Sequence, residues 1–209
     1  MIYLSDDYLN KYIDVFGYLF SRSIKEKYSL RHIERIISHS LMVDELESSN
    51  ISTIAFSSQE KIYHDMFPLY GNEDFVYNPY DLYGWLGFIY VHLFLKYQTT
   101  FETLFIVLPL DKAIESYHLY HEMDITQTYE LFASLVKYSY LDNIMKYKNI
   151  STAELSEGSG IPYSTITAIR YNKRDISKLE SAKLYKIARC LNVKITSLLN
   201  CIELEMQQF

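Results

Sequence analysis

The histidines and cysteines are the side chains best suited to bind a metal ion, so their spacing is the first test for chemistry. His118, His121 and Glu122 could present donors on one helical turn, whereas His32 and His39 lie two turns apart. A metal site needs more ligands in a defined geometry, and no further Cys or His motif accompanies these residues. We therefore expect ordinary helix surface at both places, with no metal and no cofactor.

Paired carboxylates could act as a general acid and base, and the sequence contains two such pairs, Asp6-Asp7 and Glu73-Asp74. Adjacent residues point in different directions on a helix, and Asp6-Asp7 suits the favourable negative charge at a helix N-terminus. The sequence has no phosphate-binding glycine loop, no nucleophile elbow and no HExxH motif. We therefore expect that the protein is not an enzyme.

Hydrogen-bonding side chains that do not suit a core gather in the segment 163–174. Ile166 and Ile169 are three residues apart and share one face of a helix that Pro162 can start. The opposite face carries small or hydrogen-bonding side chains: Tyr163, Ser164, Thr167, Ala168 and Arg170. A helix with this composition is suited to contact a polar ligand along its outward face.

A second short helix is predicted immediately before this one. Ser151 and Glu154 have the spacing of a capping box, and Leu155 is its first buried position. The helix should stop at Gly158-Ser159-Gly160, because glycine tolerates the positive φ of a tight turn, and Ile161 then enters the core. Two short helices joined by such a turn form a helix-turn-helix.

The run LSEGSGIPYSTITAIRYNKRDI, followed by KLYKIARCLNVKITSLL, resembles the lambda-repressor-like (Cro/XRE-type) DNA-binding domain, with five helices in order. The resemblance implies that the second helix lies in the major groove. It places four side chains against the bases: Tyr163, Ser164, Thr167 and Ala168. Thr165 would lie at the groove edge, and phosphate contacts would come from Thr152, Arg170, Asn172, Lys173 and Arg174.

This sequence departs from the family pattern at two places. Ser159 replaces a usual apolar residue, and Tyr171-Asn172 replaces a usual Asn-Gly. Asn can adopt the left-handed conformation that glycine supplies in the family. We therefore expect the fold to survive the second change.

Helical hairpins with a glycine turn are common, and some domains of this type bind only protein, so charge helps to decide. Residues 141–200 contain ten Lys and Arg against five acids, a net charge of +5, whereas residues 1–140 carry −9 and the whole chain −6. A basic segment in an acidic chain is typical of polyanion binding. The charge pattern therefore favours double-stranded DNA as a partner.

Composition indicates a folded globular protein of one or two domains, with 49% hydrophobic residues among 209. Seventeen of the 21 tyrosines precede residue 141, and their amphipathic rings suit protein interfaces. Cys190 and Cys201 form no disulfide framework, which favours reduced thiols. No basic segment followed by an apolar core opens the chain, so we expect no signal peptide and a cytoplasmic location.

Hydrophobic spacing predicts helices over most of residues 1–78. One is capped by Ser5 and ends near Lys25, and another runs from Ser29 to Leu41. The β-branched segment 51–56 predicts an isolated strand. Ser57 and Glu60 form a capping box for a helix over Gln59–Met66, and residues 68–78 read as a loop.

Asn78-Pro79 predicts the start of a helix that is apolar on every side from Leu82 to Leu95. Fourteen residues are too few to cross a bilayer, so we expect a buried central helix that Gly84 and Gly87 let a neighbouring backbone approach.

Further helices are predicted after this central helix, and one segment suits either a helix or a strand. Thr100–Leu108 suits a helix or a buried strand, and Pro109 starts a further helix. Asp124 and Gln127 form a capping box for a helix over Tyr129–Tyr138, and Leu141–Tyr147 predicts the first helix of the DNA-binding domain, with Leu141, Ile144 and Met145 inward.

The predicted protein is mostly α: a helical, acidic, Tyr-rich domain (1–138, with room for one or two short strands), a five-helix domain (139–203) and a tail (204–209). Our first hypothesis is a homodimeric, sequence-specific transcriptional regulator, because one such domain covers little DNA. Its N-terminal domain would bind a protein partner, as an autorepressing antitoxin binds a toxin. Two alternatives remain open: an anti-CRISPR or other nuclease inhibitor with an autoregulatory helix-turn-helix, and a ligand-gated repressor with a pocket beside Trp85.

Overall fold

The computed structural model describes residues 4–48, 50–67, 76–136, 140–195 and 197–199. Every element within these ranges is a helix, which confirms the mostly α prediction. The chain divides into two compact units, the first formed by Met1–Phe105 and Pro109–Thr128, the second by Ile106–Leu108 and Tyr129–Phe209. The second unit therefore begins ahead of the boundary expected at residue 139.

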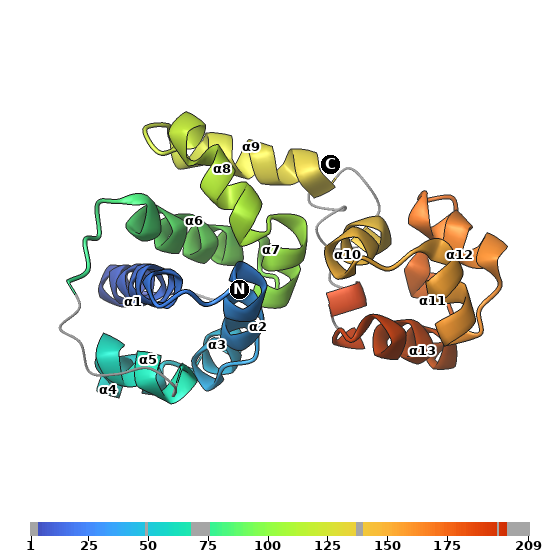
Figure 1. Ribbon diagram of the computed structural model, residues 1–209, viewed down its shortest axis with the longest axis horizontal. Helices are drawn as coiled ribbons and strands as arrows, with labels where there is room; N and C mark the ends of the chain where they lie inside the picture. The colour runs from blue at the N-terminus through green and yellow to red at the C-terminus, as the bar shows by residue number, and fades with distance from the viewer. Residues whose placement is uncertain (1–3, 49, 68–75, 137–139, 196, 200–209) are drawn as a thin grey trace. The chain divides into compact units, whose positions relative to one another are not determined.

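The first unit is built around two long helices that lie side by side, α1 and α6 (Figure 1). Its helices are α1 (Asp6–Lys25), α2 (Leu30–Ser38), α3 (Leu41–Glu47), α4 (Ser52–Phe56), α5 (Gln59–Met66), α6 (Leu82–Tyr97), α8 (Leu110–Tyr120) and α7 (Phe101–Val107) up to Phe105. A Cβ on Gly87 would overlap the α1 backbone at Ile13 and Gly17. The expected close approach at Gly87 is therefore made by α1, and it brings the two apolar helices together as the core of the unit.

The central helix α6 begins three residues later than the Asn78-Pro79 pair predicts. The Asp81 carboxylate accepts hydrogen bonds from the backbone N–H groups of Tyr83 at 2.8 Å and Gly84 at 3.3 Å. Asn78 instead accepts from the N–H of Tyr80, which closes a turn. Asp81 is thus the N-cap, because its side chain satisfies two first-turn donors.

The strand predicted over 51–56 and the possible strand within Thr100–Leu108 are both helices in the structure. Residues 52–56 form α4, where Asn50 accepts from the N–H of Ser52 at 3.1 Å and the Glu45 side chain accepts from the N–H of Thr53 at 2.7 Å. These acceptors satisfy the first-turn donors and override the β-branched composition. Residues 101–107 form α7, which resolves the ambiguity at Thr100–Leu108 in favour of the helix.

Three further helix boundaries differ from the prediction. The expected helix from Ser29 to Leu41 is two helices, because Ser40 caps α3 and accepts from the N–H of Val43 at 3.3 Å. The cap of α5 is Ser58 rather than Ser57. Helix α9 (Ile125–Val136) starts before the predicted Tyr129, and the end expected at Tyr138 lies outside the described residues, as does most of the loop predicted over 68–78.

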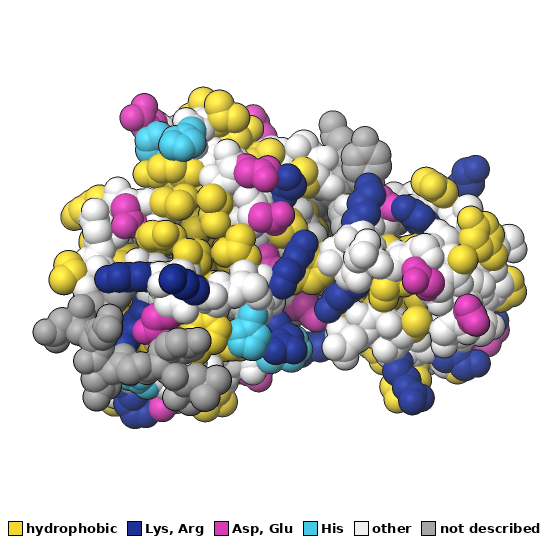
Figure 2. All heavy atoms as spheres, viewed as in Figure 1, with side chains coloured by type: hydrophobic (Ala, Val, Ile, Leu, Met, Phe, Trp, Pro, Cys, Tyr) yellow, Lys and Arg dark blue, Asp and Glu magenta, His cyan; other side chains and the backbone are white. Residues whose placement is uncertain are grey.

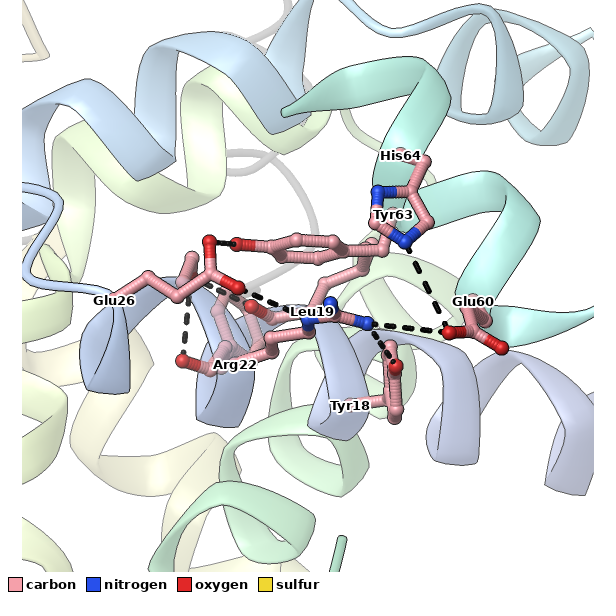
Figure 3. A network of polar contacts seen from close by, with 9 residues as sticks. Tyr18, Leu19, Arg22, Glu26, Glu60, Tyr63 and His64 are labelled. Carbon is pink, nitrogen blue, oxygen red and sulfur yellow. Dashed lines mark hydrogen bonds and ion pairs between the residues drawn. The ribbon is translucent and has the colours of Figure 1, made fainter. Parts of the chain in front are cut away.

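A buried arginine fixes α5 on α1 (Figure 3). Arg22 is 1% exposed, and its guanidinium donates to Glu26 Oε1 at 3.0 Å and to the Tyr18 hydroxyl at 2.7 Å. Tyr63 of α5 donates its hydroxyl to Glu26 Oε2 at 2.6 Å, and its ring centroid lies 4.5 Å from Arg22 Cζ. Burial disfavours the Arg22 charge, but these hydrogen bonds raise its pKa above the ordinary value. The charge is therefore retained, and it anchors α5 from inside the unit.

The second unit contains most of α9 and the helices of the predicted C-terminal domain: α10 (Tyr140–Lys148), α11 (Thr152–Ser159), α12 (Tyr163–Arg170), the 3₁₀-helix η1 (Ile176–Lys178) and α13 (Ser181–Leu191). Residues 195 and 197–199 are also helical. Leu141, Ile144 and Met145 of α10 are buried, as expected. Helices α10 and α11 both pack against α12, and α13 packs against α10 and α11. These three helices therefore hold α12 in place.

Candidate nucleic-acid interface

The turn that orients α12 forms as its sequence predicts. Ser151 accepts from the N–H of Glu154 at 3.2 Å, and the Glu154 carboxylate accepts from the N–H of Ser151 at 2.8 Å, so the capping box is confirmed. These hydrogen bonds lower the pKa of Glu154. Gly160 then adopts a φ of 66° and ends α11, which runs through Gly158 to Ser159. Only a residue that tolerates this φ lets the chain reverse here.

Ser159, which replaces a usual apolar residue, is accommodated by local hydrogen bonds. Its side chain is buried at 4% exposure. The hydroxyl donates to the carbonyl of Leu155 at 2.6 Å and accepts from the N–H of Ile161 at 3.3 Å. The hydroxyl is thus satisfied inside the domain, so the polar substitution does not cost the full penalty of a buried unpaired group.

Helix α12 has one buried and one open face. Ile166 and Ile169 are buried, at 0% and 3% exposure. At the N-terminal end of the helix, Tyr163 is 57% exposed and Ser164 is also exposed. The remaining predicted contacts, Thr165, Thr167 and Ala168, are partly exposed. The open end of α12 is therefore the end whose side chains would meet base edges first.

Thr167 is partly exposed, but its hydroxyl is not available at the surface. Its Oγ1 atom is buried and makes no hydrogen bond within the described part of the chain.

Three predicted phosphate contacts lie in the turn after α12. Asn172 has a φ of 54°, so it supplies the left-handed residue that its position requires. The backbone N–H groups of Lys173 and Arg174 both bond the carbonyl of Ala168, at 2.8 Å and 3.1 Å, which ends the helix. The side chains of all three residues are exposed. Two cations thus project from a turn of defined backbone.

Two other predicted phosphate contacts, Thr152 and Arg170, are placed differently. The Arg170 Nε–H donates to Asp142 Oδ1 at 2.6 Å, and its Nη1–H donates to the Thr152 hydroxyl at 2.8 Å. Thr152 is only 7% exposed and the Arg170 side chain 24%. These groups bind each other and Asp142, so in this structure they fix α10, α11 and α12 together.

Asp142 is the residue that sequence reasoning missed. It is 6% exposed and also accepts from Lys146 Nζ at 2.6 Å. Burial acts to raise its pKa, but the hydrogen bonds from Lys146 and Arg170 outweigh burial and lower the pKa below the ordinary carboxyl value. The spacing of Asp142 and Lys146 predicts an i,i+4 pair, whereas the partner 28 residues away has no local signal.

No group of three or more His, Cys, Asp or Glu side chains that could hold a metal ion occurs among the described residues. None of the helices in the described ranges is long and apolar enough to span a membrane. The expectation that α6 is a buried helix rather than a membrane span agrees with this finding.

Comparison with known proteins identifies one segment. No curated protein and no solved structure matches the chain. The family model of the Cro/C1-type HTH DNA-binding domain matches residues 140–203, which include α10 to α13. The C-terminal segment 140–203 is therefore a helix-turn-helix domain of the Cro/C1 type, as its sequence predicts.

Proposed function

We propose that the protein is a sequence-specific DNA-binding transcriptional regulator. The observation that carries the proposal is the open N-terminal end of α12, where Tyr163 and Ser164 are exposed above a buried apolar face. Side chains at this end of a recognition helix read base edges in the major groove. Lys173 and Arg174 would add phosphate contacts, which supply affinity but no sequence information.

A direct test compares two exposed tyrosines of the same domain. Tyr163 on α12 is 57% exposed and Tyr185 on α13 is 55% exposed. Binding sites are selected from random duplex DNA with the full chain, and affinities are then measured by electrophoretic mobility shift. Tyr163→Ala should weaken binding to the selected site by about 1–3 kcal/mol and leave non-specific binding unchanged. Tyr185→Ala is the matched control. Selection of no consensus, or equal losses for both variants, would contradict the proposal.

The regulator is further proposed to act as a homodimer. One recognition helix covers too few base pairs for tight and selective binding, whereas two helices can read half-sites about 34 Å apart on one face of DNA. The selected site should then be a near-palindrome whose halves are spaced by one helical turn. A selected site with a single asymmetric half, bound by one copy of the chain, would refute the dimer.

The N-terminal segment is proposed to bind a protein partner, as the antitoxin of a toxin–antitoxin pair does. It is acidic and rich in tyrosine, a residue enriched at protein interfaces. Large apolar side chains are also strongly exposed in the first unit, among them Phe56 at 89%, Val76 at 89% and Leu41 at 68%.

The antitoxin role is tested by expressing the protein encoded beside this chain, alone and together with it. The proposal expects the neighbouring protein to arrest growth alone and to co-purify with the chain in a non-toxic complex. Lys173→Ala with Arg174→Ala should retain this rescue, because these cations are assigned to DNA. A neighbour that neither affects growth nor binds the chain would exclude the antitoxin role.

A further inference from the structure

The first unit contains a pocket of about 370 Å³ beside the only tryptophan of the chain. It is lined by residues of α1, α6, α8 and the start of α9, and by the segments that precede α6 and follow α8. Hydrophobic side chains gather over α6 and α8 on the face shown in Figure 2. The volume lies within the range of small-molecule sites in proteins.

Four of the twelve residues that line the pocket are Phe, Trp or Tyr. Tyr80, Trp85, Phe88 and Tyr117 all line the pocket. The rings of Trp85 and Tyr117 meet edge to face, with centroids 5.4 Å apart at 72°. Tyr80 is 92% exposed and lies at the rim. The faces of such rings carry negative electrostatic potential and attract cations.

The ionisable side chains of the lining also favour a positive ligand. Among the described residues, Asp81 is the only carboxylate in the lining, and none of the Lys or Arg side chains described lines the pocket. Asp81 forms no ion pair within the described residues, and both of its hydrogen bonds come from backbone N–H groups of α6. The N-terminus of α6 contributes about half a positive charge, which offsets only part of the full negative charge of Asp81.

Two further carboxylates lie near the pocket. His121 lines the pocket, and its Nε2 lies 3.6 Å from the Glu122 carboxylate. Burial, and then the negative charges of Asp14 and Asp81, raise the pKa of the Tyr77 hydroxyl. Asp14 therefore adds a negative charge to that of Asp81 beside the N-terminal end of α6.

We propose that this pocket binds a small organic cation, an amine or quaternary ammonium on an apolar body. The aromatic walls would take the apolar body and the face of the cation, and Asp81 would balance its charge. This inference does not depend on DNA binding by the second unit.

The test uses the fluorescence of Trp85, which reports on the pocket because the chain has no other tryptophan. The full chain is titrated, without DNA, with three benzyl compounds of similar size: benzyltrimethylammonium, neutral N-benzylacetamide and anionic phenylacetate. We expect a saturable change with the cation and at least about tenfold weaker binding of the other two compounds. No saturable change with the cation, or equal binding of all three, would overturn the proposal.

Two variants separate the charge from the rings. Asp81→Asn keeps a good helix cap and should weaken binding of the cation about tenfold, whereas Asp65→Asn, on α5 and outside the lining, should not change it. Tyr117→Leu should weaken binding of the cation more than binding of N-benzylacetamide, because the substitution removes an aromatic ring but keeps apolar bulk. Unchanged affinity in both Asp81→Asn and Tyr117→Leu would refute the site.

Discussion

Asp142 illustrates how a single side chain can position a recognition helix without facing DNA. It joins α10 to the end of α12 through Arg170, and Arg170 in turn bonds Thr152 at the start of α11. Both partners of the ion pair are largely withdrawn from water. The pair therefore defines where α12 lies, and its loss would leave an incompletely paired arginine.

Replacing Asp142 with Asn should lower the free energy of unfolding at pH 7 by about 1–3 kcal/mol. Because the folded-state pKa of Asp142 is lowered, this stability is present above the unfolded-state pKa of about 3.9 and is lost as the pH falls through the folded-state pKa. Urea denaturation should therefore show a difference between wild type and variant that narrows below about pH 4. Asp65→Asn, which breaks an exposed pair, is the control. A difference that does not change with pH would contradict the assignment.

Lys173 and Arg174 should act on affinity rather than on specificity. In the proposed homodimer each alanine substitution removes one phosphate contact from each copy, so the slope of log affinity against log salt should fall in magnitude by about 1.8. Discrimination between the selected site and a scrambled duplex should stay the same. Lys61→Ala, in the first unit, is the matched control for charge. An unchanged salt slope would mean that the two cations do not contact the backbone of DNA.

At the scale of elements, the turn between α11 and α12 depends on the backbone of Gly160. A Cβ at this position would meet no atom within 4 Å, so the cost of substitution comes from the φ of 66° alone. Gly160→Ala should destabilise the second unit by about 1 kcal/mol, and Gly160→Asn by less, because Asn tolerates the left-handed region. Thermal unfolding followed by circular dichroism measures both. Equal stability of the glycine and alanine proteins would show that the turn does not require this conformation.

Helix α5 should depend on the buried network around Arg22. Tyr63→Phe removes the hydroxyl that donates to Glu26 and should lower the free energy of unfolding by about 1–2 kcal/mol, since it leaves a partly buried carboxylate oxygen with fewer partners. Tyr80→Phe is the control, because this tyrosine of the same unit is 92% exposed. Native-state hydrogen exchange should show faster opening of α5 in Tyr63→Phe. Equal protection in the two variants would exclude the anchoring role.

The elements that could be predicted from sequence are those whose signals are local. The capping box of Ser151 and Glu154, the glycine at 160 and the spacing of Ile166 and Ile169 are each signals within a few residues, and together they specify α11 and α12. Residues 52–56 were mispredicted because a side chain of another helix, Glu45 of α3, satisfies their backbone.

In the candidate interface, too, local features could be predicted from the sequence and a distant contact could not. The exposed positions of Tyr163 and Ser164 follow from helical periodicity, so they could be found from sequence. The pairing of Arg170 with Asp142 joins residues 28 positions apart and has no periodic signal. The sequence predicts a phosphate contact for Arg170, and it gives no sign that this residue also holds α12 through Asp142.

At the scale of the whole molecule, charge is divided along the chain. The net charge of −6 opposes long-range attraction to DNA, so binding must depend on the local excess of cations within residues 141–200. The same division leaves the acidic N-terminal segment available for other partners. We therefore infer that α12 is inserted in the major groove by its exposed N-terminal end.

Methylation interference on the selected duplex tests in which groove α12 lies. Methylation of guanine at N7 alters the major groove, whereas methylation of adenine at N3 alters the minor groove. We predict that guanine N7 methylation within the selected half-sites excludes DNA from the complex, and that Tyr163→Ala weakens this interference. Interference by adenine N3 methylation alone, or by neither modification, would contradict the placement of α12 in the major groove.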